Sequence, residues 1–205
     1  MPYKAMTGAA FAVICTISGC GQRVMTSEAA RELTSPSGEI VDIFGSVHRP
    51  FEDSQVRAIV LAFVMPDCPI ANSYMPELNR LYLDYGWRGV RVFLIQVDPE
   101  LSVANAQELA RQFEIKPPVV LDQRHDWVRK VGATITPEAA VLSPHGSLLY
   151  LGRIDNRYAG FGKRREQVTE RDLRDALDAI LANRSVPHRR TQAVGCFIPV
   201  SPQGE

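Results

Sequence analysis

Two nearly continuous apolar runs lie near the middle of the chain, at residues 59–64 and 90–97, and both are rich in β-branched and aromatic side chains. Such runs are typical of strands that are buried on both faces of a sheet. A shorter run at 119–121 has the same character. Apolar side chains recur at helical spacing within 74–85 and again within 106–113. The pattern predicts strands and helices in alternation, with helices on both faces of the sheet.

The second half of the chain has a different order of elements. Residues 126–131 are expected to form a short helix. Two strands, 138–142 and 148–151, flank Ser143-Pro144-His145-Gly146, which has proline and glycine where a type I turn favours them. Thr169-x-x-Asp172 has the spacing of a capping box and precedes an apolar stripe, which predicts a final amphipathic helix. Together these elements predict an α/β fold with a central mixed sheet.

The N-terminus has the pattern of an export signal. Residues 5–21 carry no charge and follow Lys4, and the apolar stretch 9–17 is far shorter than the roughly 20 residues that span a bilayer. Ile17-Ser18-Gly19-Cys20 resembles the lipobox of bacterial lipoproteins. This resemblance implies that residues 1–19 are a signal peptide and that Cys20 is lipidated. The protein would then be membrane-anchored in the cell envelope and face the periplasm or the exterior.

Composition and charge narrow the classes of function. Apolar residues make up 45% of the 205 residues and charged residues 22%, which excludes a largely disordered chain and a multi-span membrane protein. The 23 basic residues equal the 23 acidic ones, so we expect no nucleic acid among the partners.

We expect a tether at 20–37, one domain at 38–184 and a C-terminal tail at 185–205. The cysteine spacing fits no structural zinc site, and no metal or cofactor is expected.

Of the four cysteines, Cys15 leaves with the predicted leader and Cys20 is the predicted lipidation site, so Cys68 and Cys196 remain as thiols. Cys68 lies between a predicted strand and a predicted helix. Backbone N–H groups at a helix start lower a thiol pKa and favour the reactive thiolate. Pro69 suits the first helical turn, where an N–H would be unpaired. We therefore predict that Cys68 is nucleophilic.

The segment 63–78 resembles the active-site strand, loop and helix of thioredoxin-like proteins of the TlpA/ResA type. Cys68 matches the first cysteine of their Cys-x-x-Cys motif, and Met75-Pro76-Glu77-Leu78 matches the helix that follows. The resemblance implies a thioredoxin-like fold and a redox-active cysteine. Ala71 stands at the position of the second cysteine, so this chain is expected to be a one-cysteine variant.

A second motif supports the same resemblance. Thr136-Pro137-Glu138 is similar to the cis-proline segment that precedes the hairpin in this family. The resemblance implies that the Thr136–Pro137 bond is cis. It also implies that Thr136 and Pro137, together with Pro69, form the substrate-binding surface that holds an extended partner peptide beside Cys68.

Two neighbouring families leave alternatives open. Cys68-Pro69 also resembles the peroxidatic motif of the AhpC/TSA peroxiredoxins, which suggests a thiol peroxidase. Met65, however, stands where those enzymes have Thr or Ser, and their arginine would have to be one of three: Arg124, Arg129 or Arg153. Copper-handling proteins of the SCO type share the fold, and a copper site here would need His125 or His145 beside Cys68. A non-enzymatic lipoprotein that binds copper or a protein partner is the remaining alternative.

Cys196 belongs to a small apolar segment, 193–199, that follows the polar stretch 183–190. Such a segment is expected to dock on another surface. Three roles are open for Cys196: a resolving cysteine for Cys68, a buried structural residue, or a thiol that pairs with another chain. The leading prediction is a lipid-anchored extracytoplasmic thiol-disulfide oxidoreductase that acts on protein thiols or disulfides.

Overall fold

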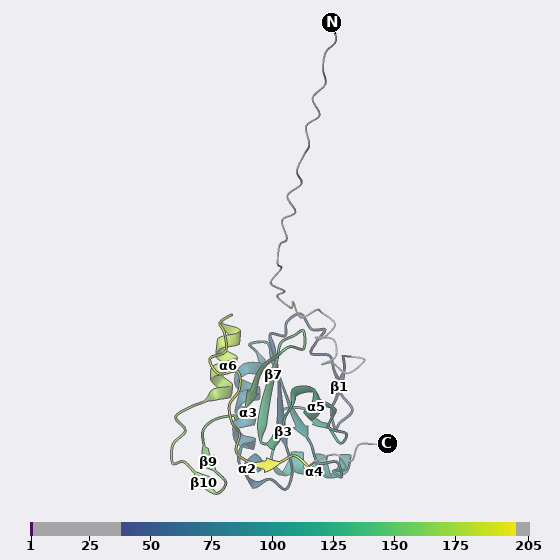
Figure 1. The fold of residues 1–205 in the computed structure, drawn as a ribbon. Helices are drawn as coiled ribbons and strands as arrows, with labels where there is room; N and C mark the ends of the chain where they lie inside the picture. The colour runs from purple at the N-terminus through teal and green to yellow at the C-terminus, as the bar shows by residue number, and fades with distance from the viewer. Residues whose placement is uncertain (2–37, 200–205) are drawn as a thin grey trace.

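The computed structural model of the protein describes residues 38–199 together with Met1. Its centre is a five-stranded sheet in the order β5-β4-β3-β7-β8 (Figure 1). The strands are β3 (Ala58–Val64), β4 (Val90–Gln96), β5 (Val119–Leu121), β7 (Glu138–Leu142) and β8 (Leu148–Gly152). The first three are parallel, and β7 and β8 are antiparallel to their neighbours. Every residue of β3 is buried, as expected for a strand covered on both faces.

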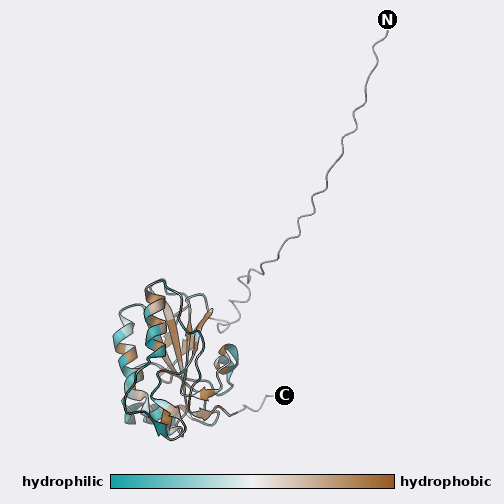
Figure 2. Cartoon of the chain, turned by 60° about the vertical axis from the view of Figure 1, so that its left-hand side comes forward, coloured by the Kyte–Doolittle hydropathy of each residue, from teal (hydrophilic) through white to brown (hydrophobic). Residues whose placement is uncertain are grey.

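Helices cover both faces of this sheet. Val60 and Ala62 of β3 face a core cluster with α3 (Met75–Gly86), α4 (Val103–Gln112) and α6 (Asp172–Leu181). Ile59, Leu61 and Phe63 point to the other face, toward α5 (Asp126–Val131). Figure 2 shows hydrophobic strands packed between helices that are hydrophilic on their outer sides. The predicted thioredoxin-like α/β fold, with a mixed central sheet flanked by helices, is confirmed.

Several short strands surround the sheet and were not predicted. They are β1 (Ile40–Val41), β2 (Val47–His48), β6 (Ile135–Thr136), β9 (Tyr158–Gly160), β10 (Lys163–Arg164) and β11 (Cys196–Phe197). β11 pairs antiparallel with β6. In Figure 1, β11 is the yellow arrow beside α2 (Pro69–Ser73). The apolar part of the C-terminal segment therefore docks on the domain, as predicted.

Two details of the predicted helices differ from the structure. The helical stretch predicted within 74–85 forms α3, and a separate short helix, α2, precedes it and ends at Tyr74, because Pro76 fits the first turn of a new helix. The predicted capping box is wrong, because the residue that precedes α6 is Arg171 and Thr169 forms its hydrogen bonds with Asn156 instead. The Thr169 N–H donates to Asn156 Oδ1 at 3.0 Å, and Asn156 Nδ2 donates to Thr169 Oγ1 at 2.7 Å. The hairpin of β7 and β8 forms as predicted.

The predictions for the N-terminal region concern residues that the structure does not describe. The signal peptide at 1–19, lipidation at Cys20 and the tether at 20–37 lie outside the described residues. Among residues 38–199, no helix is long and apolar enough to cross a lipid bilayer.

Candidate active site

Cys68 lies at the turn between β3 and α2. Its side chain caps the helix, because the Ala71 N–H donates to Cys68 Sγ at 3.4 Å. Pro69 occupies the first turn, as predicted, and is itself exposed. Cys68 has no exposed surface. The turn thus presents Cys68 to the interior of the protein, where another segment of the chain meets it.

That segment is β6 with the proline after it. The Thr136–Pro137 bond is cis, which confirms the prediction. The Cys68 thiol donates to the Thr136 carbonyl oxygen at 3.0 Å. The Glu138 carboxylate accepts from the Thr134 N–H at 2.9 Å and so fixes the chain that leads into β6. The two motifs that resemble the TlpA/ResA type are therefore in direct contact.

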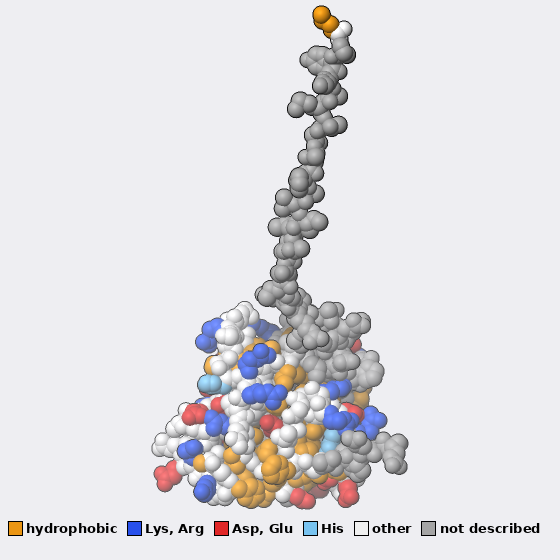
Figure 3. Space-filling view, viewed as in Figure 1, with side chains coloured by type: hydrophobic (Ala, Val, Ile, Leu, Met, Phe, Trp, Pro, Cys, Tyr) orange, Lys and Arg blue, Asp and Glu red, His pale blue; other side chains and the backbone are white. Residues whose placement is uncertain are grey.

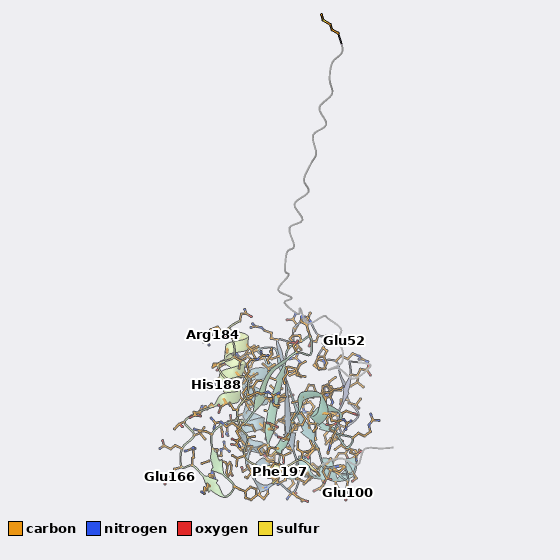
Figure 4. All side chains as sticks on the ribbon, in the orientation of Figure 1. Glu52, Glu100, Glu166, Arg184, His188 and Phe197 are labelled. Atoms are coloured by element: carbon orange, nitrogen blue, oxygen red, sulfur yellow. The ribbon has the colours of Figure 1, made fainter. Side chains whose placement is uncertain are left out.

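Cys196 completes the cluster from the C-terminal segment. In the pairing of β11 with β6, Cys196 lies opposite Thr136 and Phe197 opposite Ile135. The Thr136 hydroxyl donates to the Cys196 carbonyl oxygen at 3.4 Å. Cys68 and Cys196 are free thiols, and both cysteines neighbour Thr136. In Figure 4, Phe197 marks this place, at the same end of the molecule as β11 in Figure 1.

The two thiols differ in acidity. Burial raises the pKa of Cys68, but the neighbouring Cys196 and the hydrogen bond from the Ala71 N–H outweigh it, so the pKa of Cys68 is lowered from its usual value. The Thr136 carbonyl oxygen acts in the opposite sense, because it accepts from a thiol and repels a thiolate. Burial and the neighbouring Cys68 raise the pKa of Cys196 to about 11. Cys68 is therefore the more acidic thiol, and Cys196 is the donor that stabilises its thiolate.

This arrangement predicts a pH dependence that matched variants can test. Cys196→Ala removes the S–H donor and is expected to raise the pKa of Cys68, so the thiolate fraction at neutral pH falls. Cys196→Ser keeps a hydroxyl donor and is expected to leave the pKa of Cys68 closer to its native value. The measurement is the ultraviolet thiolate absorbance against pH, after subtraction of the same titration for Cys68→Ser. Identical titrations for the alanine and serine variants would show that Cys196 does not stabilise the thiolate.

Gly195 is a site residue that sequence reasoning missed. A Cβ at this position would overlap the Thr136 carbonyl oxygen, and would lie 2.7 Å from the carbonyl carbon and 3.1 Å from Pro137 Cδ. A glycine is therefore required for β11 to approach β6 this closely. A glycine directly before a cysteine, inside an isolated apolar segment, is the sequence signal that could have identified it.

A family model described as the AhpC/TSA family matches residues 44–151, which is more than half of the chain. The protein belongs to the AhpC/TSA family. Among curated proteins, this family member is 26% identical over 116 residues to the thiol-disulfide oxidoreductase ResA of Geobacillus thermodenitrificans. That match covers 56% of this chain and spans 64% of the length of the relative. ResA of Bacillus thuringiensis is 24% identical over 148 residues, which is 68% of this chain and 84% of the relative.

Two solved structures resemble this AhpC/TSA chain over most of its length. An uncharacterised conserved protein from Geobacillus kaustophilus has a TM-score of 0.67 and 27% identity, with coverage of 81% of this chain and 89% of its own. A hypothetical protein from Sinorhizobium meliloti has a TM-score of 0.66 and 26% identity, with coverage of 78% and 88%. The similarity to ResA proteins agrees with the resemblance of the motif around Cys68 to the TlpA/ResA type.

The arginines considered for a peroxidase site in this AhpC/TSA member are engaged elsewhere. Arg124 and Arg129 pair with Asp126 on α5, and Arg153 pairs with Asp172. Within residues 38–199, no hydrogen bond joins any of these arginines to Cys68. Met65, three residues before Cys68, accepts from the Cys68 N–H through its backbone carbonyl at 3.2 Å and has no hydroxyl to offer.

The histidines considered for copper are not brought to the thiols either. Because β7 is antiparallel to β3, the turn that carries His145 lies at the opposite end of β3 from Cys68. His125 is buried, and its Nε2 lies 2.7 Å from the Val97 carbonyl oxygen. Among the residues that the structure describes, no group of three or more His, Cys, Asp or Glu side chains could hold a metal ion.

A polar network supports the start of α3, next to the site. Tyr74, which separates α2 from α3, donates its hydroxyl to Asp155 Oδ1 at 2.6 Å. Arg157 pairs with the same carboxylate at 3.2 Å, lies over the Tyr74 ring at 4.4 Å, and donates to the Ser73 carbonyl at 3.2 Å. Burial and the Asp155 carboxylate raise the pKa of Tyr74, so it remains a hydrogen-bond donor. No sequence pattern pointed to this network, because its members come from two distant segments.

Proposed function

We propose that the protein is a thiol-disulfide oxidoreductase in which Cys68 is the nucleophile and Cys196 the resolving cysteine. The observation that carries this proposal is the pairing of β11 with β6, which sets Cys196 opposite Thr136 while Cys68 contacts the Thr136 carbonyl. A cysteine of the C-terminal tail thereby takes the role that Ala71 cannot fill. The similarity to ResA proteins supports the same class of reaction.

The reaction can be written so that atoms and electrons balance. The Cys68 thiolate attacks one sulfur of a partner disulfide, the partner's S–S bond breaks, and the departing sulfur takes up a proton as a thiol. Cys196 then loses its proton and attacks Cys68 Sγ, which forms the Cys68–Cys196 disulfide and releases the second partner sulfur. The partner gains two electrons, and an external dithiol restores the two cysteines. The reverse sequence oxidises a partner dithiol.

Residues around the thiols have separate parts in this scheme. Thr136 and Pro137 are buried where β11 pairs with β6, so with the exposed Pro69 they hold the partner's backbone only after β11 has left this edge. The Ala71 N–H and the Cys196 thiol stabilise the Cys68 thiolate before the attack. The higher pKa of Cys196 keeps it protonated until the mixed disulfide has formed.

Turnover with a model protein disulfide tests the proposal. The chain, supplied with an external dithiol, is expected to reduce insulin disulfides faster than the dithiol alone. Cys68→Ser is expected to lose the whole of this acceleration, since a serine hydroxyl is not ionised at neutral pH. Acceleration that survives in Cys68→Ser would assign the activity to another group.

Location is the second part of the proposal. The protein is exported and anchored by acyl chains on Cys20. Each methylene of these chains that is buried in the bilayer contributes about 0.8 kcal/mol to membrane binding. The native chain is expected to sediment with membranes and to be released by detergent, whereas Cys20→Ala is expected in the soluble fraction. Unchanged sedimentation of Cys20→Ala would contradict lipid anchoring.

A thiol peroxidase is the second candidate, because Cys68 has no exposed surface and a hydroperoxide is a much smaller substrate than a protein disulfide. The Cys68 thiolate would attack one peroxide oxygen, the O–O bond would break, and the other oxygen would take up a proton and leave as water or an alcohol. The resulting sulfenic acid on Cys68 would condense with the Cys196 thiol to a disulfide and water. Met65 in place of a hydroxyl residue favours the disulfide reaction over this one. If the protein consumed peroxide faster than it reduced insulin at equal substrate concentration, thiol peroxidase would be the better supported activity.

A further inference from the structure

The backbone edge of β6 beside Cys68 is occupied by the chain's own tail. Besides the pairing of Cys196 with Thr136, the Ile198 N–H donates to the Thr134 carbonyl at 3.0 Å. A peptide that pairs with this edge as an antiparallel strand therefore has to take the place of β11. β11 lies beside α2 (Figure 1), and its Phe197 is 79% exposed, so this strand is at the surface of the molecule.

Two parts of the tail contact the domain: a base around Thr191 and a tip formed by β11. At its base, the Thr191 hydroxyl lies 2.7 Å from the Tyr150 hydroxyl and accepts from the Arg153 N–H at 3.1 Å. Gly152 allows this contact, since a Cβ there would lie 2.5 Å from the Thr191 carbonyl oxygen. At the tip, β11 has two residues, and Phe197 is 79% exposed. So short a strand has few hydrogen bonds, and Val194, Cys196 and Ile198 pack against the core, so a segment that displaces the tip has to replace these apolar contacts.

The close fit of Gly195 against β6 determines which segments can pair with the β6 edge. The Thr136 carbonyl faces Cys68 on one side and Gly195 on the other, where a Cβ would overlap its oxygen. A strand with any other residue before its cysteine cannot lie in this register without displacing β6. Hydrophobic side chains are exposed at this end of the molecule (Figure 3), and Phe197, which follows Cys196 in the tail, is also exposed here (Figure 4).

We propose that β11 is a resident occupant of the β6 edge that competes with partner segments for it, and that its glycine fit sets which segments can replace it. The partner segment replaces β11 in the same register, with its cysteine opposite Thr136 and a glycine immediately before that cysteine. This inference rests on the proposed function and names its substrate class. The Cys68 thiolate attacks the partner cysteine's sulfur within a disulfide, and the other sulfur of that disulfide leaves as a thiolate. The tail then returns, and Cys196 resolves the mixed disulfide.

Two synthetic peptides test this specificity on the full-length chain. One has the sequence of residues 193–199, Ala-Val-Gly-Cys-Phe-Ile-Pro, and the other has alanine in place of the glycine. Each carries thionitrobenzoate in a disulfide on its cysteine, and the coloured leaving group reports attack by Cys68 in the Cys196→Ser chain. The glycine peptide is expected to react at least about tenfold faster, because the added Cβ overpacks the site. Free cysteine, which should attack both peptides equally, controls for their intrinsic reactivity.

A second variant tests whether the tail competes for the edge. Adding Gly195→Ala to Cys196→Ser dislodges β11 from β6. The reaction of Cys68 with the glycine peptide is then expected to become several-fold faster. Gly86→Ala is the matched control, because a Cβ there meets nothing within 4 Å and its addition should leave the rate unchanged. Without acceleration by Gly195→Ala, β11 is not a competing occupant.

The outcomes separate this inference from the proposed function. Dithionitrobenzoate, a small disulfide, measures the reactivity of Cys68 without any peptide. Equal rates for the two peptides, with Cys68 reactive toward dithionitrobenzoate, would overturn the glycine requirement and leave the proposed function intact. A Cys68 that reacts with none of the three disulfides would overturn both.

Discussion

Replacing Cys196 with serine is expected to convert a transient mixed disulfide at Cys68 into a stable adduct. The serine keeps the shape and a hydrogen-bond donor beside Cys68, but it cannot attack the disulfide sulfur. Partner proteins attacked by Cys68 would therefore remain linked to the chain. The measurement is non-reducing electrophoresis of cells that express Cys196→Ser, in which a new set of high-mass bands should disappear on reduction.

Matched variants define the origin of these bands. Cys68→Ser alone and the double variant with Cys196→Ser are both expected to lack them, because the attacking thiolate is gone. Bands that persist in the double variant would come from another cysteine. A Cys196→Ser chain with no more adducts than the native chain would mean that Cys196 does not resolve the mixed disulfide.

The largest expected loss of stability is at Asp155. Its carboxylate is buried, accepts from the Tyr74 hydroxyl and pairs with Arg157. Asp155→Ala leaves a buried hydroxyl and a largely buried guanidinium without their partner, which costs about 3–5 kcal/mol of unfolding free energy. Chemical denaturation followed by circular dichroism measures the change.

Two controls identify the cause of that loss. Asp155→Asn keeps an acceptor for Tyr74 but removes the charge, so its loss should be smaller than that of Asp155→Ala. Asp126→Ala removes a carboxylate that is 41% exposed and pairs with exposed arginines, and such surface pairs contribute at most about 1 kcal/mol. If Asp155→Ala cost no more than Asp126→Ala, the network would not hold the start of α3.

The central sheet and its helices could be predicted because their signals are local. A buried strand such as β3 is a continuous apolar run, and α5 and the β7–β8 hairpin are bounded by turn residues close in sequence. The position of Cys68 followed from the same signals, since a strand that ends just before a proline-led helix places the cysteine at the helix start. The cis-proline contact needed the family resemblance, since most X–Pro bonds are trans.

The rest of the site depends on contacts between distant segments. β6 and β11 have two residues each, too few to show any periodicity, and their pairing is visible only in three dimensions. The fit of Gly195 against Thr136 is equally a matter of spatial approach. The Thr169 prediction failed for a related reason: its hydroxyl has a tertiary partner in Asn156, which took precedence over a local cap.

The redox pairing of Cys68 with Cys196 is tested most directly by peptide mapping of the chain after equilibration with oxidised glutathione. The thiols are then blocked, the chain is digested without reduction, and the fragments are identified by mass. The main oxidised product is expected to be an intramolecular link between the peptides of Cys68 and Cys196, because the Cys68 thiol contacts Thr136 and Cys196 pairs with Thr136 across the two strands. Two free thiols, or glutathione on each cysteine without a link between them, would contradict this pairing.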